Sequence, residues 1–385
     1  MSNNTITKGT ELAASCFKKS QIILSNGVLH VKQTVVYKVN PGKPEADSIQ
    51  AAATIIRAGG LVAFPTETVY GLGADALNSD AVLALFTAKN RPLDNPPIVH
   101  VENLSDVYKL AEEVSSKAEF LIKQFWPGPL TLVFKKYPIV PDVTTAGLET
   151  VAVRMPKNQV ALALIKASGC PIAAPSANLS GKPSPTSAKH VFEDLNGRID
   201  AILDGGSTHI GVESTVLDVS VDPPMLLRPG GASLEALEKA VGKVLLHPFI
   251  TAEAELGAEK AKSPGMLHKH YAPKAQVILV EGIVPAVMSK VKELTGACWL
   301  ENKRVGVLAT DETAWAYEAD VVKSMGSRRN VDAIAANLFG LLREFDEENV
   351  DVIIAESVPT EGLGLAVMNR LRKASGYTIV KVFQG

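Results

Sequence analysis

Two short segments carry side chains that could bind a polyphosphate. Lys89 and Arg91 place two cations on either side of one residue, and Ser176 and Asn178 place a hydroxyl and an amide at the same spacing. An arginine fork can bind two phosphate oxygens at once, whereas a lysine ammonium acts as a mobile point charge. A Walker loop is absent, because Gly181 is followed by lysine but position 176, where that motif needs its first glycine, is serine. The segments therefore predict a phosphate pocket of another kind.

Further polar residues lie where apolar runs end. Thr68 follows the run 61–64, in a loop rich in threonine and glycine, and Arg154 and Arg228 each end an apolar run. Ligands of open α/β sheets bind at strand ends, and glycines in such a loop let the backbone approach a ligand closely. A strand-end arginine in an apolar setting also needs an anion. That anion is either an internal carboxylate or the carboxylate of a substrate.

The segment 263–273 combines proline, histidine, lysine and tyrosine side chains. A passive linker rarely carries so many amphipathic side chains, so this segment could fold over a nucleotide as a lid. Structural alternatives exist for all of these motifs: Lys89 and Arg91 could complement a helix dipole, and the loops could be capped turns. The residue types alone indicate a cleft for a nucleotide and a small anion, and they do not define the reaction.

The elements that must position these residues follow an α/β pattern in two domains. A chain of 385 residues is too long for one ordinary domain. Consecutive short strands near 214–227 imply antiparallel pairs, whereas strand–helix alternation after 275, with strands expected at 276–280, 304–308 and 351–355, implies a doubly wound sheet. We expect an N-terminal tail or extra hairpin (1–31), a larger domain with a twisted mixed sheet and flanking helices (32–245), a linker or lid (246–274), and a smaller C-terminal Rossmann-like domain (275–385).

Composition narrows the class of protein further. Hydrophobic residues make up 46% and charged residues 21% of the chain, which is typical of a globular protein. The formal net charge of −2 gives no overall attraction to nucleic acid or membranes. No apolar run reaches the roughly 20 residues of a membrane span, and residues 1–20 lack the apolar core of a signal peptide. Three widely separated cysteines fit a reducing compartment. We therefore expect a cytoplasmic protein.

Three motifs resemble those of the YrdC-like family. They are Phe-Pro-Thr-Glu-Thr-Val-Tyr-Gly-Leu-Gly at 64–73, Lys-Asn-Arg-Pro at 89–92 and Pro-Ser-Ala-Asn-Leu-Ser-Gly at 175–181. The Lys-x-Arg and Ser-x-Asn pair is the signature of that family. The linker and the additional C-terminal domain look like its longer two-domain branch, the threonylcarbamoyl-AMP synthases. Pro97 stands where leucine is common, and 267–268 differ from the usual Lys-Tyr, but neither departure touches a signature position.

This resemblance implies a nucleotidyltransferase reaction: L-threonine, bicarbonate and ATP, accompanied by Mg²⁺, give L-threonylcarbamoyl-AMP and pyrophosphate. The product would pass to a tRNA threonylcarbamoyl-transfer complex for the t6A37 modification, with at most weak tRNA binding by this chain. By motif position, the resemblance implies catalytic roles for Lys89, Arg91, Ser176 and Asn178; ATP binding by these four with Asn95, Thr150, Ser184, Arg228, His270 and Tyr271; and L-threonine binding by Thr68, His100, Arg154, Ala174 and Ser214.

Two other functions fit the same fold. A module that handles carbamoyl-adenylate from carbamoyl phosphate usually belongs to a larger protein with zinc-finger-like segments, and three scattered cysteines argue against it. A binding module for structured RNA would need a basic concave face, which near-neutral overall charge disfavours. Pyrophosphate release that requires both threonine and bicarbonate distinguishes the synthase from either alternative.

Overall fold

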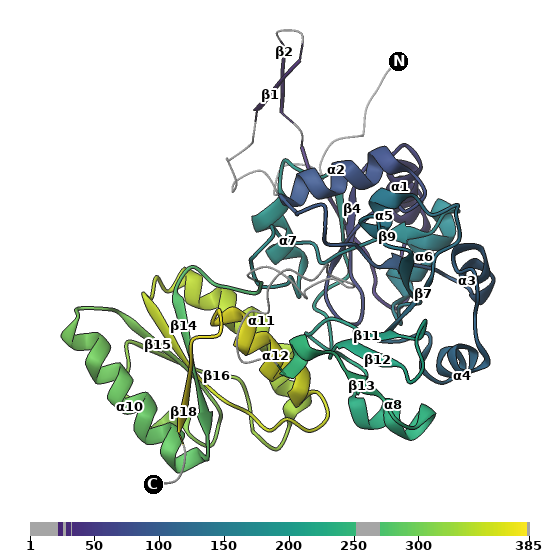
Figure 1. The fold of residues 1–385 in the computed structure, drawn as a ribbon. Coiled ribbons are helices and arrows are strands. Elements are labelled where there is room, and N and C mark those ends of the chain that lie inside the picture. Colours follow the sequence, from purple (N-terminus) through teal and green to yellow (C-terminus); the bar gives the residue numbers. More distant parts are fainter. Residues whose placement is uncertain (1–21, 26–27, 32, 252–269, 383–385) are drawn as a thin grey trace.

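The computed structural model describes residues 22–25, 28–31, 33–251 and 270–382. Two α/β domains lie side by side, the first coloured purple to green and the second green to yellow in Figure 1. An eleven-stranded mixed sheet forms the centre of the first domain, and a five-stranded sheet forms the centre of the second. The predicted mixed α/β fold with a smaller parallel-sheet domain is therefore confirmed.

The first-domain sheet has the strand order β13-β12-β11-β7-β8-β6-β9-β5-β4-β10-β3. Several of its strands are apolar throughout, such as Val-Ala-Phe in β4, because both faces of the sheet are buried. The strands are β3 (Val35–Lys38), β4 (Val62–Phe64), β5 (Gly71–Asp75), β6 (Val99–His100), β7 (Leu130–Lys135), β8 (Thr150–Arg154), β9 (Ile172–Ala173), β10 (Ala201–Asp204), β11 (Thr215–Asp218), β12 (Met225–Arg228) and β13 (Leu245–Leu246).

Amphipathic helices cover this sheet. In α1 the buried residues Ile49, Ala52, Ala53 and Ile56 recur at helical spacing and pack toward the sheet. The helices are α1 (Ala46–Arg57), α2 (Ser79–Lys89), α3 (Leu104–Leu110), α4 (Ser116–Phe125), α5 (Asp142–Thr145), α6 (Gln159–Ser168), α7 (Ala188–Leu195), α8 (Leu234–Val241) and α9 (Pro248–Thr251). Phe249 and Ile250 are buried in first-domain clusters, so this domain extends past the predicted boundary at 245.

The glycine-rich stretch after Thr68 is a strand and not the expected loop. Residues 71–75 form β5, which pairs antiparallel with both β4 and β9. A Cβ atom at Gly73 would lie 2.9 Å from side-chain atoms of both Phe64 and Ile172. Close packing within the sheet, and not approach to a ligand, therefore accounts for Gly73.

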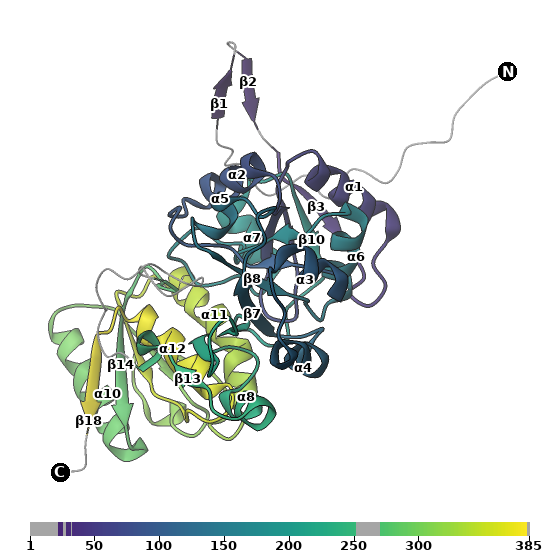
Figure 2. The same ribbon diagram turned by 45° about the vertical axis from the view of Figure 1, so that its right-hand side comes forward.

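At the N-terminal end, β1 (Ile22–Ser25) and β2 (Val28–Val31) pair antiparallel, as the expectation of an extra hairpin allowed. This hairpin projects from the first domain in both Figure 1 and Figure 2. The rest of the predicted tail lies outside the described residues, as does most of the predicted lid, at 252–269.

The second domain has an all-parallel sheet in the order β16-β15-β17-β14-β18. Its strands are β14 (Gln276–Gly282), β15 (Val305–Ala309), β16 (Val321–Ser324), β17 (Val352–Glu356) and β18 (Ile379–Val382). The edge strands β16 and β18 were not predicted, because they are short and only half-buried. A 3-10 turn, η1 (Ala314–Ala316), follows β15. No helix in the described ranges is long and apolar enough to cross a bilayer.

Helices cover both faces of this second sheet. One face packs against α10 (Val284–Leu300) through Val287 and Val291. The other face packs against α11 (Val331–Glu347) and α12 (Gly364–Ala374), which lie between the second sheet and the first domain in Figures 1 and 2. The helices α11 and α12 therefore lie on the side of the second sheet that faces the first domain.

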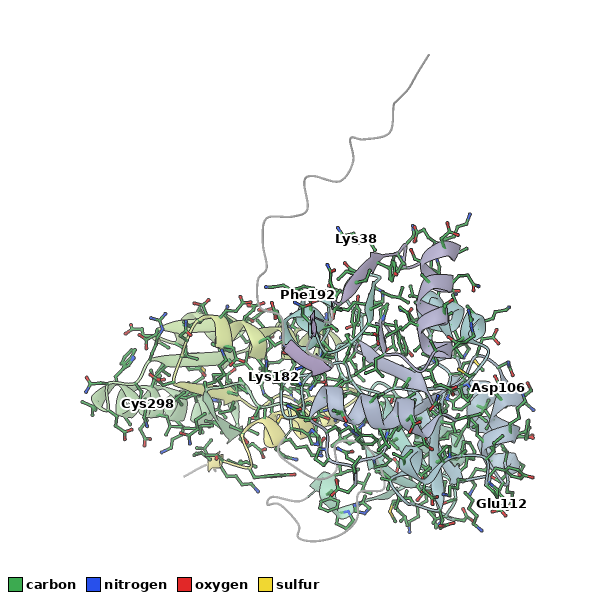
Figure 3. The ribbon with its side chains drawn as sticks, turned by 90° about the horizontal axis from the view of Figure 1, so that it is seen from above. Lys38, Asp106, Glu112, Lys182, Phe192 and Cys298 are labelled. Carbon is green, nitrogen blue, oxygen red and sulfur yellow. The ribbon has the colours of Figure 1, made fainter. Side chains whose placement is uncertain are left out.

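The contact between the domains is apolar and ionic. Val69 and Val212 of the first domain belong to the same buried cluster as Phe339 of α11. Arg343 of α11 forms a buried ion pair with Asp194 of α7 at 2.8 Å. Seen from above in Figure 3, Lys182 lies where the domains meet, and it also pairs with Asp194, at 2.8 Å. The second domain is thus docked by specific contacts close to the predicted site.

Candidate functional site

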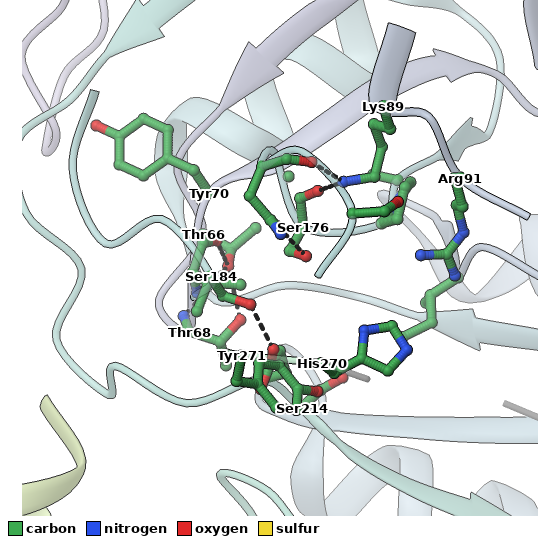
Figure 4. A pocket seen from close by; sticks show the side chains of 18 of the residues that line it. Thr66, Thr68, Tyr70, Lys89, Arg91, Ser176, Ser184, Ser214, His270 and Tyr271 are labelled. Carbon is green, nitrogen blue, oxygen red and sulfur yellow. Dashed lines mark hydrogen bonds between the residues drawn. The ribbon is translucent and has the colours of Figure 1, made fainter. Parts of the chain in front are cut away.

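One pocket collects residues from the strand ends of the first domain and from the end of the linker. Figure 4 shows Lys89 and Arg91 on one side, and Thr66, Thr68 and Ser184 on the other. Of the residues predicted by motif position, those that line this pocket are Thr68, Lys89, Arg91, His100, Arg154, Ala174, Ser176, Asn178, Ser184, Ser214, Arg228, His270 and Tyr271.

Lys89 joins the two signature segments directly. Its side chain is 1% exposed, and its ammonium donates hydrogen bonds to the main-chain carbonyls of Ser176 and Asn178. The Ser176 hydroxyl in turn donates to the Asn178 side-chain oxygen at 2.6 Å. Burial and the nearby Arg91 lower the pKa of Lys89. Since an ammonium has three N–H groups, two hold this loop and one can serve a ligand.

Arg91 follows the end of α2, where Asn90 adopts a left-handed conformation and closes the helix. Its guanidinium donates from Nε to the Asn95 carbonyl at 2.8 Å and from Nη2 to the Pro96 carbonyl at 3.2 Å. Burial and Arg228 lower the pKa of Arg91 to about 9, so the group is still positively charged at neutral pH. The helix-dipole alternative does not account for these hydrogen bonds of Arg91 or for its position in the same pocket as Lys89.

Two residues from the predicted ATP set do not line the pocket. Thr150 begins β8 and pairs with Lys135, whereas the pocket residue Arg154 is at the other end of the same strand. A spacing of four residues along a strand corresponds to about 13 Å. Asn95 is fully buried beside Arg91, and neither polar atom of its side-chain amide has a hydrogen-bond partner. Its amide therefore has unused bonding capacity next to the pocket.

Arg154 reaches the pocket from the end of β8. Nη1 donates to the Thr68 hydroxyl at 3.1 Å, and Nε donates to the Gly128 carbonyl at 3.1 Å. Nη2 also forms an ion pair with Oε2 of Glu67 at 2.7 Å, although the geometry of this contact is not that of a hydrogen bond. An internal carboxylate is thus one partner of Arg154, and its contact with Thr68 places the cation at the pocket wall.

His100 is buried at the end of β6, next to Arg154 in the β6–β8 register. Burial and the charge of Arg154 lower the pKa of His100 to about 3. Its Nδ1 lies 3.1 Å from the Ile98 carbonyl, which accepts a hydrogen bond in the tautomer that carries its proton on Nδ1. His100 therefore acts at neutral pH as an uncharged hydrogen-bonding group.

This neutral state predicts a pH dependence of stability. A histidine whose pKa is lower in the folded state stabilises the fold fully above its unfolded value of about 6.5, and this stability is lost as the pH falls toward 3. The slope is at most about 1.4 kcal/mol per pH unit. Urea denaturation from pH 7.5 to 5 should show a shallower decline for His100→Gln than for wild type. Equal declines would contradict a buried neutral His100; His190, whose pKa is also lowered, is common to both proteins.

Arg228 and Glu213 organise the opposite wall. Arg228 donates from Nη2 to the Ser214 carbonyl at 2.8 Å and to the Ser214 hydroxyl at 3.2 Å. Glu213 accepts from the Ser184 hydroxyl at 2.6 Å. Although burial alone would raise the pKa of Glu213, the charges of Arg370 and Arg228 hold it at about 2. This wall is therefore a charged network with the side chains of Ser184 and Ser214 fixed within it.

Tyr271 closes the pocket from the linker side. It is buried, has a positive φ of 65°, and stacks on Phe339 of the second domain with ring centroids 5.2 Å apart. Burial and Glu213 raise the pKa of Tyr271 to about 12. The ring of His270 lies beside that of Tyr271, with centroids 5.6 Å apart (Figure 4). The end of the predicted lid is thus part of the pocket wall.

Sequence reasoning missed several members of the site. Thr66, Tyr70, Ser180, Lys182 and Glu213 also line the pocket, and each lies next to or within a motif that was recognised. Proximity to those motifs was a usable signal for all five. The buried Arg370 of α12, which pairs with Glu213 at 2.9 Å, had no such signal because it belongs to the other domain.

The charge of the pocket selects for anions. Its lining includes Lys89, Arg91, Arg154, Lys182 and Arg228, against one carboxylate, Glu213, that is already paired. Several buried cations in one cleft need anionic partners, and arginine forks suit phosphate and carboxylate oxygens. The charge of the pocket therefore suits a polyphosphate and a smaller carboxylate.

The same lining does not form a magnesium cage. Mg²⁺ takes oxygen ligands in an octahedron and is usually held by one or two carboxylates and substrate phosphates. Within the described part of the chain, no group of three or more His, Cys, Asp or Glu side chains is placed to hold a metal ion. The residues therefore do not fit a resident metal, and they are compatible with an ion that arrives bound to phosphates.

Family comparisons agree with this architecture. Residues 54–230 match the Sua5/YciO/YrdC family, described as "Telomere recombination", and residues 232–376 match the family described as "Threonylcarbamoyl-AMP synthase, C-terminal domain". A threonylcarbamoyl-AMP synthase of Pyrococcus abyssi is 55% identical over 334 residues, covering 87% of this chain and 96% of the relative. One from Bacillus subtilis is 51% identical over 337 residues, covering 86% and 94%.

Similarity extends over both domains in three dimensions. The crystal structure of P. abyssi Sua5 complexed with L-threonine superposes with a TM-score of 0.86 at 53% identity, and the match covers 91% of this chain and 100% of that one. The chain belongs to the Sua5/YciO/YrdC family, in its two-domain form.

Proposed function

We propose that this chain synthesises L-threonylcarbamoyl-AMP and pyrophosphate from L-threonine, bicarbonate and ATP, for the threonylcarbamoyladenosine modification of tRNA. The observation that carries the proposal is that two groups of cationic residues line the same pocket. Lys89 and Arg91 lie beside the loop containing Ser176, and Arg154 lies with Thr68 at another part of the wall. A nucleotide and an amino acid could be held there side by side.

The nucleotide is assigned to the signature segments and the Glu213 wall. Lys89 and Arg91 would bind phosphate oxygens, and Ser176 and Asn178 would present their polar side chains from the loop that Lys89 fixes. Ser184, Arg228, His270 and Tyr271 would contact the rest of ATP. The buried amide of Asn95 would complete the set by taking a hydrogen-bond partner that it otherwise lacks.

L-Threonine is assigned to the wall around Arg154. The guanidinium would bind the threonine carboxylate in competition with Glu67, which the same group contacts at 2.7 Å. Neutral His100 and the hydroxyls of Thr68 and Ser214 would bond its polar groups, and the backbone at Ala174 would supply a main-chain contact. The P. abyssi relative bound to L-threonine supports a threonine ligand in this family.

The reaction would proceed in two steps. The threonine amine attacks carbon dioxide or bicarbonate to form a carbamate, with a proton released in the carbon dioxide case and water released in the bicarbonate case. A carbamate oxygen then attacks the α-phosphorus of ATP, and pyrophosphate leaves. Because both partners are anions, catalysis rests on positioning and on neutralisation of charge by Lys89 and Arg91. Mg²⁺ would enter as part of the ATP substrate, and we assign it no protein ligand.

The product is a reactive mixed anhydride, so it must be consumed by a transfer reaction. We infer a separate tRNA threonylcarbamoyl-transfer complex as its acceptor and a cytoplasmic location for both. A formal net charge of −2 supports at most weak binding of tRNA by this chain. No observation on the described residues favours the RNA-binding alternative, because three of the pocket cations, Lys89, Arg154 and Arg228, are buried.

Product analysis tests this proposal. Incubation with ATP, Mg²⁺, L-threonine and bicarbonate should give a threonylcarbamoyl-adenylate mass and equimolar pyrophosphate, and omission of threonine or bicarbonate should abolish both. Pyrophosphate release without threonine would indicate a different acceptor. Binding of RNA with no pyrophosphate release under any condition would favour the binding module.

A further inference from the structure

We propose that Arg370, on α12 of the second domain, is a positioning residue. It fixes the relative positions of three segments of the catalytic pocket, those of Glu213, Pro229 and Tyr271. This assigns to the C-terminal domain a direct part in shaping the site, and it rests on the proposed function. Arg370 is the bulkiest fully buried residue in the described part of the chain, with 0% exposure. Such a buried cation must be matched by specific partners.

The first partner is the Glu213 carboxylate. Arg370 donates from Nε to its Oε2 atom at 2.9 Å, while Oε1 accepts from the Ser184 hydroxyl at 2.6 Å. Glu213 directly precedes Ser214 in the chain. The position of this one carboxylate therefore affects Ser184, assigned to ATP, and Ser214, assigned to threonine.

The second and third partners lie on other segments. Nη1 of Arg370 donates to the Pro229 carbonyl at 2.8 Å, and Pro229 directly follows Arg228. The guanidinium also lies over the Tyr271 ring, 5.5 Å from its centroid, in a cation–π contact. The guanidinium of Arg370 thus links the start of β11, the end of β12 and the end of the linker. No first-domain side chain described above contacts all three of these segments.

Backbone packing around these segments supports a fixed geometry. A Cβ atom at Gly230 would lie 2.3 Å from the Glu213 carbonyl, so the segment that follows β12 runs against the segment containing Glu213. A Cβ atom at Gly211 would lie 2.3 Å from the Ala335 carbonyl of α11. The second domain therefore contacts the Glu213 segment closely on two sides, through α11 backbone and through Arg370.

The informative variant is Arg370→Lys. Lysine keeps a positive charge for Glu213, but its single ammonium cannot reproduce the planar fork that contacts Glu213, Pro229 and Tyr271 together. We expect a melting temperature close to that of wild type and a fall in kcat/KM for ATP of about 10-fold or more. Arg372→Met is the control, because Arg372 lies on the same helix as Arg370 and its ion pair, at 2.7 Å with Glu281 of β14, lies within the second domain.

A second variant separates fold stability from site geometry. Arg370→Met leaves Glu213 buried without its arginine and is expected to lower the melting temperature, whereas Arg370→Met/Glu213→Gln removes both charges and should recover much of it. The double variant should still show a reduced kcat/KM. Wild-type kinetics in Arg370→Lys, or an equal loss in Arg372→Met, would overturn the inference.

Calorimetric titration with L-threonine alone and with ATP added makes the test independent of turnover. Weaker ligand binding by Arg370→Lys, with Arg372→Met binding as wild type, supports the positioning role even if no protein of the set releases pyrophosphate. An absence of pyrophosphate release from every protein of the set would refute the proposed reaction, whereas the binding difference would still support the positioning role of Arg370. Equal binding by wild type, Arg370→Lys and the double variant would overturn the role of Arg370.

Discussion

Replacing Arg91 with alanine is expected to lower kcat/KM by about 30- to 1,000-fold, which corresponds to about 2–4 kcal/mol of transition-state stabilisation. The physical reason is that the guanidinium is half-buried and positively charged, and that its bonds to two main-chain carbonyls hold it in the same pocket as Lys89. In that dry setting a fixed cation stabilises developing phosphate charge more strongly than water would. Steady-state kinetics of pyrophosphate release with ATP varied measures the loss.

Two controls accompany this variant. Arg91→Lys keeps a cation but loses the fork, so it should fall between wild type and Arg91→Ala. Arg57→Ala changes an exposed arginine on α1 and should keep wild-type kinetics. Because Arg91 also holds the carbonyls of Asn95 and Pro96, each variant is compared at a temperature well below its melting point. Near-normal turnover by Arg91→Ala would exclude Arg91 from the mechanism.

The second large effect is expected at Arg154. Arg154→Met leaves the Glu67 carboxylate buried without its ion-pair partner, which should lower the free energy of unfolding by about 3–5 kcal/mol. Since typical domains have 5–15 kcal/mol in total, this is a large fraction of the stability. The KM for L-threonine should also rise, by roughly 10- to 100-fold, through loss of a charge-assisted contact with its carboxylate.

The double variant Glu67→Gln/Arg154→Met distinguishes the two effects. Removing both charges should restore most of the free energy of unfolding, measured by urea denaturation, because no uncompensated ion remains buried. The KM for threonine should stay high, because the anion partner of the substrate is still missing. If the double variant instead bound threonine normally, Arg154 would be a structural residue paired only with Glu67.

Much of the fold could be predicted from local patterns. Apolar runs ending in Pro65, Arg154 or Arg228 identified β4, β8 and β12, because strand composition is set by burial on both sheet faces. The stretch 71–75 was predicted as loop because two glycines in a short segment are typical of turns. Tertiary packing overrides that preference at Gly73, where the neighbouring side chains leave no space for a Cβ atom.

For the site, the sequence by itself determined which residue types are available and which of them are neighbours. Lys89 with Arg91, and Ser176 with Asn178, are close because one residue separates the members of each pair. The first pair lies at the end of α2 and the second follows β9. A match in motif position alone does not place a residue in the pocket. Thr150 and Arg154 belong to the same strand, β8, but only Arg154, at the other end of the strand, lines the pocket.

Only the tertiary structure decided which distant partners complete the pocket. Lys89 bonds to Ser176 and Asn178, 87 and 89 positions away, and Arg370 bonds to Glu213 across 157 positions. Nothing local distinguishes Arg370 from Arg372 on the same helix, yet the first is fully buried in the catalytic wall and the second pairs within its own domain. The physical reason is that the burial of this charge depends on how the two sheets and their helices pack against each other. Local sequence periodicity does not encode that packing.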